Sequence, residues 1–228
     1  MNETICVLDV KIDNCSVKQA MKTSVEYMST AVTNVVELVT IETLMSVRDM
    51  PDLKNAIEQS DLVLPGQAEI LEAAGIADAR HIQEIETQIY IKMYLKYLHK
   101  NHSRVYLLVE TDEEVDRLTA CLFSRYKGIQ IVGAAKVAPG TDMDDMLVNA
   151  INGGEVDSVI AALSSPVQEE FIARNRSLIN ARMWLGMGKL MEPIYKDRSK
   201  GKRFASFIDR IFFKREIEKN RREMNAHG

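Results

Sequence analysis

A short apolar run that leads directly into a helix start is the feature that most constrains the fold of this chain. The run covers residues 156–163 and is bounded by turn-forming residues, a pattern typical of a strand buried on both faces of a parallel sheet. Ser165 then suits the N-cap, Pro166 the first helical position, and Gln168 the last position of a capping box. The sequence therefore predicts a strand that feeds a helix of an open α/β sheet.

The junction between this strand and this helix is a candidate ligand site. Ligands of open α/β sheets bind at the carboxyl ends of the strands. The unpaired N–H groups of a helix start also attract anions such as a diphosphate. Capping boxes are common helix starts, however, so a well-capped surface helix without a ligand is the alternative interpretation.

Strand and helix patterns alternate along the rest of the chain. The sequence predicts strands over residues 5–10, 35–40, 62–64, 105–109, 129–134 and 183–187. It predicts helices over residues 17–28, from residue 51, and over residues 67–74, 81–99, 112–126 and 142–151. This alternation predicts the α/β fold class, with a parallel or mostly parallel sheet covered by helices on both faces.

Composition excludes several classes of protein. No apolar run approaches the roughly 20 residues that a helix needs to cross a bilayer, and the N-terminus lacks the pattern of a signal peptide. Cys6, Cys15 and Cys121 are scattered, which favours reduced thiols in a cytoplasmic protein. No Cys/His pair has the spacing of zinc ligands, so we expect no metal site. The net charge of -4 argues against a nucleic-acid partner.

Charge and pattern divide the chain into a body, residues 1–193, and a basic C-terminal appendage, residues 194–228. Between residues 196 and 223, eleven basic and five acidic residues give a net charge of +6, which leaves -10 on the rest of the chain. The appendage has an apolar helical stripe that includes Phe204, Phe207 and Phe212, with Lys214 and Arg215 beside it. Such a helix can lie on an anionic membrane surface. Packing against the body, or against a second copy in a homo-oligomer, is the alternative.

Five motifs occur in the order and spacing of a known family. They are IDNCSVKQA, SDLVLP, RYKGIQIVG, SSPVQEEFIARNR and WLGMG. With them, residues 5–188 resemble the WecG/TagA/CpsF glycosyltransferases, glycosyltransferase family 26. The family block G-x-G-S-P-x-Q-E-x-W-I is kept at its Ser, Pro, Gln, Glu and Ile, whereas both glycines are replaced and the Trp is Phe171.

The resemblance implies a Rossmann-like body and a specific reaction. Members transfer an amino sugar of the N-acetylmannosamine type from a UDP-sugar donor to a polyprenyl-diphosphate-linked acceptor, with inversion and without a metal or other cofactor. A basic appendage helps to bring the enzyme to the inner face of the cell membrane and to complete the active site. By resemblance, this chain is then a peripheral cytoplasmic glycosyltransferase of cell-surface polysaccharide synthesis.

The resemblance also implies a set of site residues. The proposed base of the family is the Asp of an L-P-D-G motif, but Gly66 stands at that position here. Glu69 is therefore the candidate base, and Glu192 keeps a second carboxylate near the end of the body. The substrate-binding residues implied by the family motifs are Thr40, Arg80, Ser165, Pro166, Gln168, Glu169, Gly186 and Gly188.

Other departures from the family pattern support a second hypothesis. A glycine-rich turn of the family is replaced by Val109-Glu110-Thr111, which removes flexible backbone that could approach a ligand. The motif residues that this sequence keeps are mostly those of the fold and of one helix start. The motif residues that it lacks are mostly those presumed to act in catalysis. The alternative is a catalytically degenerate homologue that acts as a nucleotide-sugar-binding or scaffold module.

Deletion of residues 204–228 tests the membrane interpretation of the appendage. Because the phenylalanine stripe and its basic flanks would supply the lipid contacts, the truncated chain is expected to lose sedimentation with anionic liposomes. Neutral phosphatidylcholine liposomes are the control. Unchanged sedimentation of the truncated chain would contradict the membrane interpretation.

Overall fold

Six parallel strands form the central sheet of the protein, described by a computed structural model over residues 3–47, 49–137 and 144–191. The strands are β3 (Asn34–Val39), β4 (Leu62–Pro65), β5 (Arg104–Val109), β6 (Gln130–Lys136), β7 (Ser158–Ala161) and β8 (Met183–Gly186). Their order in the sheet is β4-β3-β8-β7-β5-β6, and every neighbouring pair is parallel. The predicted α/β class is therefore confirmed.

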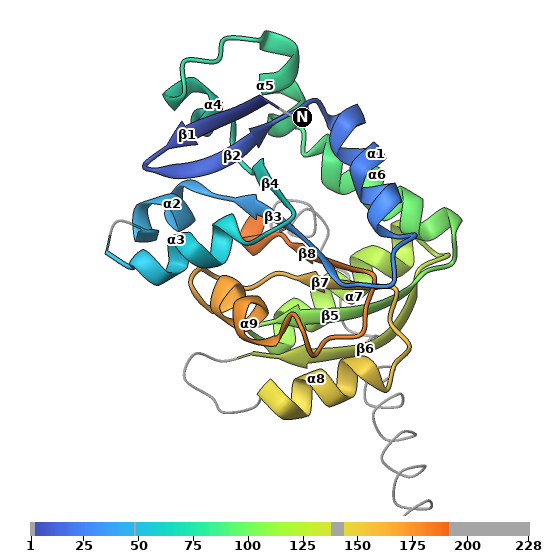
Figure 1. Ribbon diagram of the computed structural model, residues 1–228. Helices are drawn as coiled ribbons and strands as arrows, with labels where there is room; N and C mark the ends of the chain where they lie inside the picture. The colour runs from blue at the N-terminus through green and yellow to red at the C-terminus, as the bar shows by residue number, and fades with distance from the viewer. Residues whose placement is uncertain (1–2, 48, 138–143, 192–228) are drawn as a thin grey trace, which may run out of the picture.

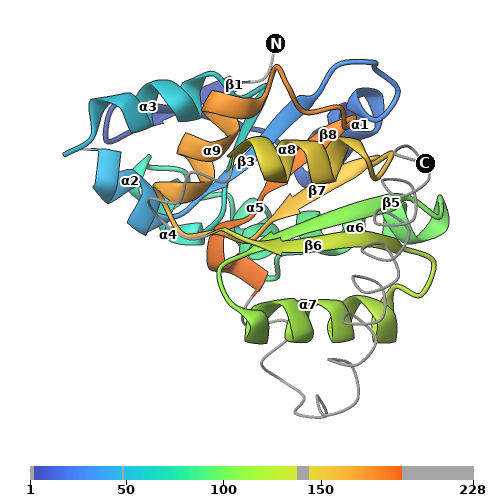
Figure 2. The same ribbon diagram turned by 90° about the horizontal axis from the view of Figure 1, so that it is seen from below.

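Helices cover both faces of this sheet. They are α1 (Val17–Tyr27), α2 (Ile41–Val47), α3 (Pro51–Glu58), α4 (Ala68–Ala73), α5 (Ala79–Glu86), α6 (Ile89–Lys100), α7 (Asp112–Arg125), α8 (Asp144–Asn152) and α9 (Val167–Asn175). Helices α1, α6 and α7 contribute to the core on one face, and α8 and α9 to the core on the other. Figure 2 shows α7 on one side of the sheet and α8 and α9 on the opposite side.

The apolar strand runs divide their side chains between these two cores. In β3, Val36 and Leu38 join the core beneath α1, α6 and α7, whereas Val35 joins the core beneath α8 and α9. Successive side chains of a strand point to opposite faces, so a strand in the middle of a doubly covered sheet must be apolar on both sides. All six residues of β3 are buried, but one of them is the acidic Glu37.

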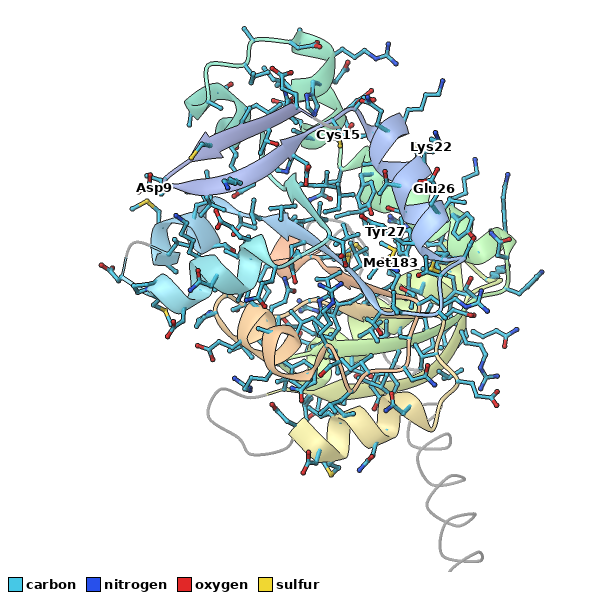
Figure 3. The ribbon with its side chains drawn as sticks, in the orientation of Figure 1. Asp9, Cys15, Lys22, Glu26, Tyr27 and Met183 are labelled. Carbon is cyan, nitrogen blue, oxygen red and sulfur yellow. The ribbon has the colours of Figure 1, made fainter. Side chains whose placement is uncertain are left out.

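The N-terminal strand predicted over residues 5–10 is instead half of a hairpin. Strands β1 (Glu3–Val7) and β2 (Val10–Asn14) pair antiparallel, and Figure 1 shows them beside β4. Leu8 and Asp9 form the turn with φ of 49° and 65°, the conformation of a two-residue hairpin turn. Asp9 is labelled at the tip of this hairpin in Figure 3. The sequence signal was missed because leucine rarely adopts a positive φ.

The helix predicted over residues 81–99 is two helices, α5 and α6. Gln88 between them has a φ of 50°, the left-handed conformation, which interrupts the helix. Its side-chain Nε2 donates a hydrogen bond to the carbonyl oxygen of Leu190 at 2.6 Å. A long-range contact thus fixes this break, and helical periodicity alone does not report it.

The capping box predicted at the start of α9 is wrong. Pro166 is the N-cap, the Ser165–Pro166 peptide bond is cis, and no side chain caps the helix. The Ser165 hydroxyl is buried and makes no hydrogen bond, while the Gln168 side chain turns into the protein and bonds Glu37. Ser16 and Thr111, in contrast, form capping boxes at the starts of α1 and α7.

Within the residues that the structure describes, no helix has the length and apolar character required to cross a membrane. The appendage residues Phe204, Phe207, Phe212, Lys214 and Arg215 lie outside the described residues. The division of the chain at residue 193 and the membrane contact of the appendage stay predictions.

A pair of alanine substitutions tests the revised helix start. Thr111→Ala removes a side-chain cap from α7 and is expected to lower the free energy of unfolding by about 1 kcal/mol. Ser165→Ala removes a hydroxyl without a hydrogen bond, so its effect is expected to stay below about 0.5 kcal/mol. Urea denaturation measures the free energy of unfolding of both variants. An equal loss of stability in the two variants would show that Ser165 caps α9 after all.

Candidate functional site

A pocket of about 710 Å³ opens at the carboxyl ends of the central strands. Its walls come from the segments after β3, β4 and β7 and from the 3-10 helix η1 (Gly188–Met191) that follows β8. From β3 the chain proceeds to one edge of the sheet, and from β5 to the other. Ligands of open α/β sheets bind near such a reversal of strand order. The strand-to-helix junction before α9 is one wall of this pocket.

The pocket gathers most of the residues that the sequence singled out. Among the predicted site residues, its walls include Thr40, Glu69, Ser165, Glu169 and Gly188. Two more lie directly behind the wall, where the side chain of Gln168 accepts a hydrogen bond from the Gly188 N–H at 3.0 Å, and Gly186 ends the buried strand β8.

Three predicted site residues are not part of these walls. Arg80 is exposed on α5, where its Nε lies 3.4 Å from Glu84, and it does not line the pocket. Pro166 caps α9 next to the pocket wall. Glu192 lies outside the described residues. The roles assigned to these three residues stay predictions.

Glu37 is a buried carboxylate that the sequence analysis did not single out. It lies in β3 with 2% of its surface exposed. The Gln168 amide donates to its Oε2 at 2.7 Å, and the Trp184 indole N–H donates to its Oε1 at 3.3 Å. The one sequence signal for this residue was an acidic side chain inside the apolar run of β3.

The surroundings of Glu37 favour its neutral form. Burial and the negative charge of Glu169 raise its pKa well above the usual range, although the hydrogen bonds from Trp184 and Gln168 oppose this. Gly186 makes room for the carboxylate, because a Cβ at residue 186 would lie 1.9 Å from Glu37 Oε2. The second glycine of WLGMG, Gly188, has a φ of 53°, which favours glycine.

Glu169 is the buried carboxylate of the pocket wall. Only 3% of its surface is exposed, and its Oε2 makes no hydrogen bond. Burial raises its pKa to about 6, because removal from water disfavours the charged form of the carboxyl group. A carboxyl group with this pKa can accept or give up a proton near neutral pH, which suits general acid–base chemistry or a hydrogen bond to a sugar hydroxyl.

The walls carry far more negative than positive charge. Five carboxylates line the pocket, from Glu42, Glu69, Glu72, Glu86 and Glu169, and the one cation in the described walls is Lys189. Lys189 is itself paired with Glu110 at 2.7 Å and Glu114 at 2.8 Å. No group of three or more potential metal ligands occurs among the described residues. These walls therefore suit the hydroxyl groups of a sugar better than a free diphosphate.

Fold and pocket together define an α/β protein with a sugar-sized acidic site at the carboxyl edge of a parallel sheet. The family model described as the glycosyl transferase WecG/TagA/CpsF family matches residues 5–197. The chain belongs to this glycosyltransferase family, as its motifs indicated. No curated protein matches the chain.

The pKa of Glu169 predicts a specific dependence of stability on pH. Because the pKa rises from 4.5 to about 6 on folding, the folded state binds more protons than the unfolded state between these values. Glu169 therefore stabilises the fold fully below pH 4.5 and loses that contribution as pH rises through 6.

The variant Glu169→Gln removes this titration. Its free energy of unfolding relative to wild type is expected to increase by about 2 kcal/mol between pH 4.5 and pH 7. Urea denaturation of both proteins across this range measures the difference. Glu26→Gln, which removes an exposed carboxylate of α1 that pairs with Lys22, is the control. A difference between wild type and Glu169→Gln that does not change with pH would contradict the raised pKa.

Proposed function

We propose that this protein is an inverting, metal-independent glycosyltransferase that moves an amino sugar of the N-acetylmannosamine type from a UDP-sugar to a polyprenyl-diphosphate-linked acceptor. The reaction would serve cell-surface polysaccharide synthesis, at the inner face of the cell membrane. The observation that carries the proposal is that Glu69 lines the same pocket as Ser165 and Glu169. A carboxylate available as base thus shares a pocket with residues of the family block that this sequence keeps.

The space around Gly66 explains why the base is proposed at Glu69. A Cβ at residue 66 would lie 2.7 Å from the backbone oxygen of Val39 and 2.7 Å from Leu190. The Gly66 N–H also donates to that Val39 oxygen at 2.8 Å. No side chain fits at this position without movement of the backbone, so the aspartate of the family motif has no room here.

Glu69 is suited to replace that aspartate. It lies in the first turn of α4, which follows β4 and Gly66 directly, and it is exposed to the pocket. A base in this position could take the proton of the acceptor hydroxyl as that oxygen attacks the anomeric carbon of the donor. An acidic residue in the first turn also favours the helix dipole, so the test must separate catalysis from stability.

The departing diphosphate needs more positive charge than Lys189 supplies, because Lys189 is already paired with Glu110 and Glu114. Helix starts and arginines can supply such charge when no metal does so. The basic residues between 196 and 203 follow η1 closely in the chain, and we assign this role to them. The same acidic walls favour the second candidate function, a degenerate homologue that binds a sugar or a scaffold partner without transferring anything.

Turnover by the purified full-length protein separates these two functions. With UDP-N-acetylmannosamine and a polyprenyl-diphosphate-N-acetylglucosamine analogue, wild type is expected to release UDP. Glu69→Gln is expected to reduce kcat by about 10²-fold or more, the usual contribution of a general base, without a change in melting temperature.

Glu26→Gln is the control for this experiment. Glu26 is an exposed carboxylate of α1 that pairs with Lys22 at 3.8 Å, and Figure 3 shows both residues on the outer side of that helix. Its substitution should leave turnover unchanged. Binding of several UDP-sugars by wild type without any turnover would instead favour the degenerate homologue.

A further inference from the structure

Three hydrogen-bond donors converge on the carboxylate of Glu110 at the edge of the pocket. The backbone N–H of Ser164 donates to Oε1 at 2.6 Å, and the Ser164 hydroxyl donates to Oε2 at 3.2 Å. The ammonium group of Lys189 lies 2.7 Å from Oε2. These donors come from the segment after β7 and from η1, whereas Glu110 follows β5.

This set of donors is chemically suited to a phosphate group. A backbone N–H, a hydroxyl and an ammonium group, all directed at one anion, form the charge-assisted hydrogen bonds with which proteins hold phosphate oxygens. Ser164 and Lys189 are themselves part of the pocket wall. The anion that occupies the position is a carboxylate of the same chain.

Lys189 does not depend on Glu110 alone for its placement. Lys189 Nζ also contacts Glu114 Oε1 at 2.8 Å and the carbonyl oxygen of Ala162 at 3.3 Å. Glu114 is fixed in turn, because its Oε2 accepts from the backbone N–H groups of Glu110 and Thr111. The ammonium group would therefore remain near Ser164 if the Glu110 side chain moved away.

Glu110 is also partly open to water. Its side chain is 23% exposed, and the side chain of Lys189 is 24% exposed. Burial alone would raise the pKa of Glu110, but the hydrogen bonds from Lys189 and Ser164 outweigh it and lower the pKa. The side chain is thus an anion at neutral pH that borders water on one side.

We propose that Ser164 and Lys189 form a diphosphate-binding position of the pocket, and that Glu110 occupies it as an internal anion until a ligand displaces it. Two ligands of the proposed reaction carry a diphosphate, the nucleotide-sugar and the lipid-linked acceptor. Glu110 competes with either one, so it weakens the binding of a diphosphate and leaves the binding of a neutral sugar unchanged.

Binding of inorganic pyrophosphate to the full-length protein tests this proposal. Isothermal titration calorimetry at pH 7.5 is expected to show that Glu110→Ala binds pyrophosphate at least about tenfold more tightly than wild type, because the freed charge-assisted hydrogen bonds pass to the ligand. Glu113→Ala, which removes an exposed carboxylate of the same region, should change the affinity less than twofold.

A second substitution assigns the gain to this position. In the double variant Glu110→Ala/Lys189→Met, the added affinity for pyrophosphate is expected to disappear. A gain that persists without Lys189, or no gain in Glu110→Ala, overturns the proposal. Glu110→Gln removes the charge with little change of shape, so it replaces Glu110→Ala if that variant does not fold, as judged by its thermal transition.

Titration with UDP and with geranyl diphosphate identifies the source of the diphosphate. The ligand whose diphosphate reaches Ser164 and Lys189 gains affinity in Glu110→Ala, and a failure of both ligands to gain overturns the proposal. This inference rests on the proposed pocket and not on catalysis. A gain in binding without turnover by wild type would uphold the internal anion and reject the glycosyltransferase function.

Discussion

The hydrogen bonds of one buried carboxylate fix the position of the candidate site. Glu37 in β3 accepts hydrogen bonds from Gln168 of α9 and from Trp184 of β8. These bonds connect β3 to its neighbouring strand β8 and to helix α9. Gln168 continues the connection to the Gly188 N–H. Because an unsatisfied polar group in this core would cost about 1–3 kcal/mol, these partners are held together. Two walls of the pocket, the start of α9 and the start of η1, are thereby set relative to the sheet.

Carboxylates of the chain itself lie beside the groups of the pocket that could bind an anionic ligand. Glu110 bonds the Ser164 N–H and Lys189, and Glu169 places its carboxylate in the first turn of α9. The helix start that sequence analysis assigned to a diphosphate therefore already has a carboxylate beside it. This arrangement is consistent with a pocket that selects sugar hydroxyls on one side. The charge for a diphosphate must then come from groups that become free or arrive from elsewhere in the chain.

Sequence periodicity was sufficient to predict the parallel sheet, because a strand that is buried on both faces must be apolar along its length. It was insufficient to predict local conformation where a distant contact decides it. Gln88 breaks a continuous helical stripe because its side chain bonds Leu190, and the start of α9 lacks a capping box because Gln168 bonds Glu37. Comparison with the family motifs singled out Thr40, the α9 block and, as a substitute for the missing aspartate, Glu69. All of these contribute to one pocket in the structure. The same comparison could not reveal Glu37, which lies outside these motifs.

The lack of space at Gly66 makes the departure from the family motif difficult to reverse. An aspartate at residue 66 would collide with the main chain of β3 and with Leu190, so a single substitution cannot return the family arrangement. Its return requires a displaced strand end and a smaller or shifted side chain at residue 190. Residues 66 and 190 are thus structurally coupled, and this fold admits a pocket carboxylate far more readily at Glu69 than at residue 66.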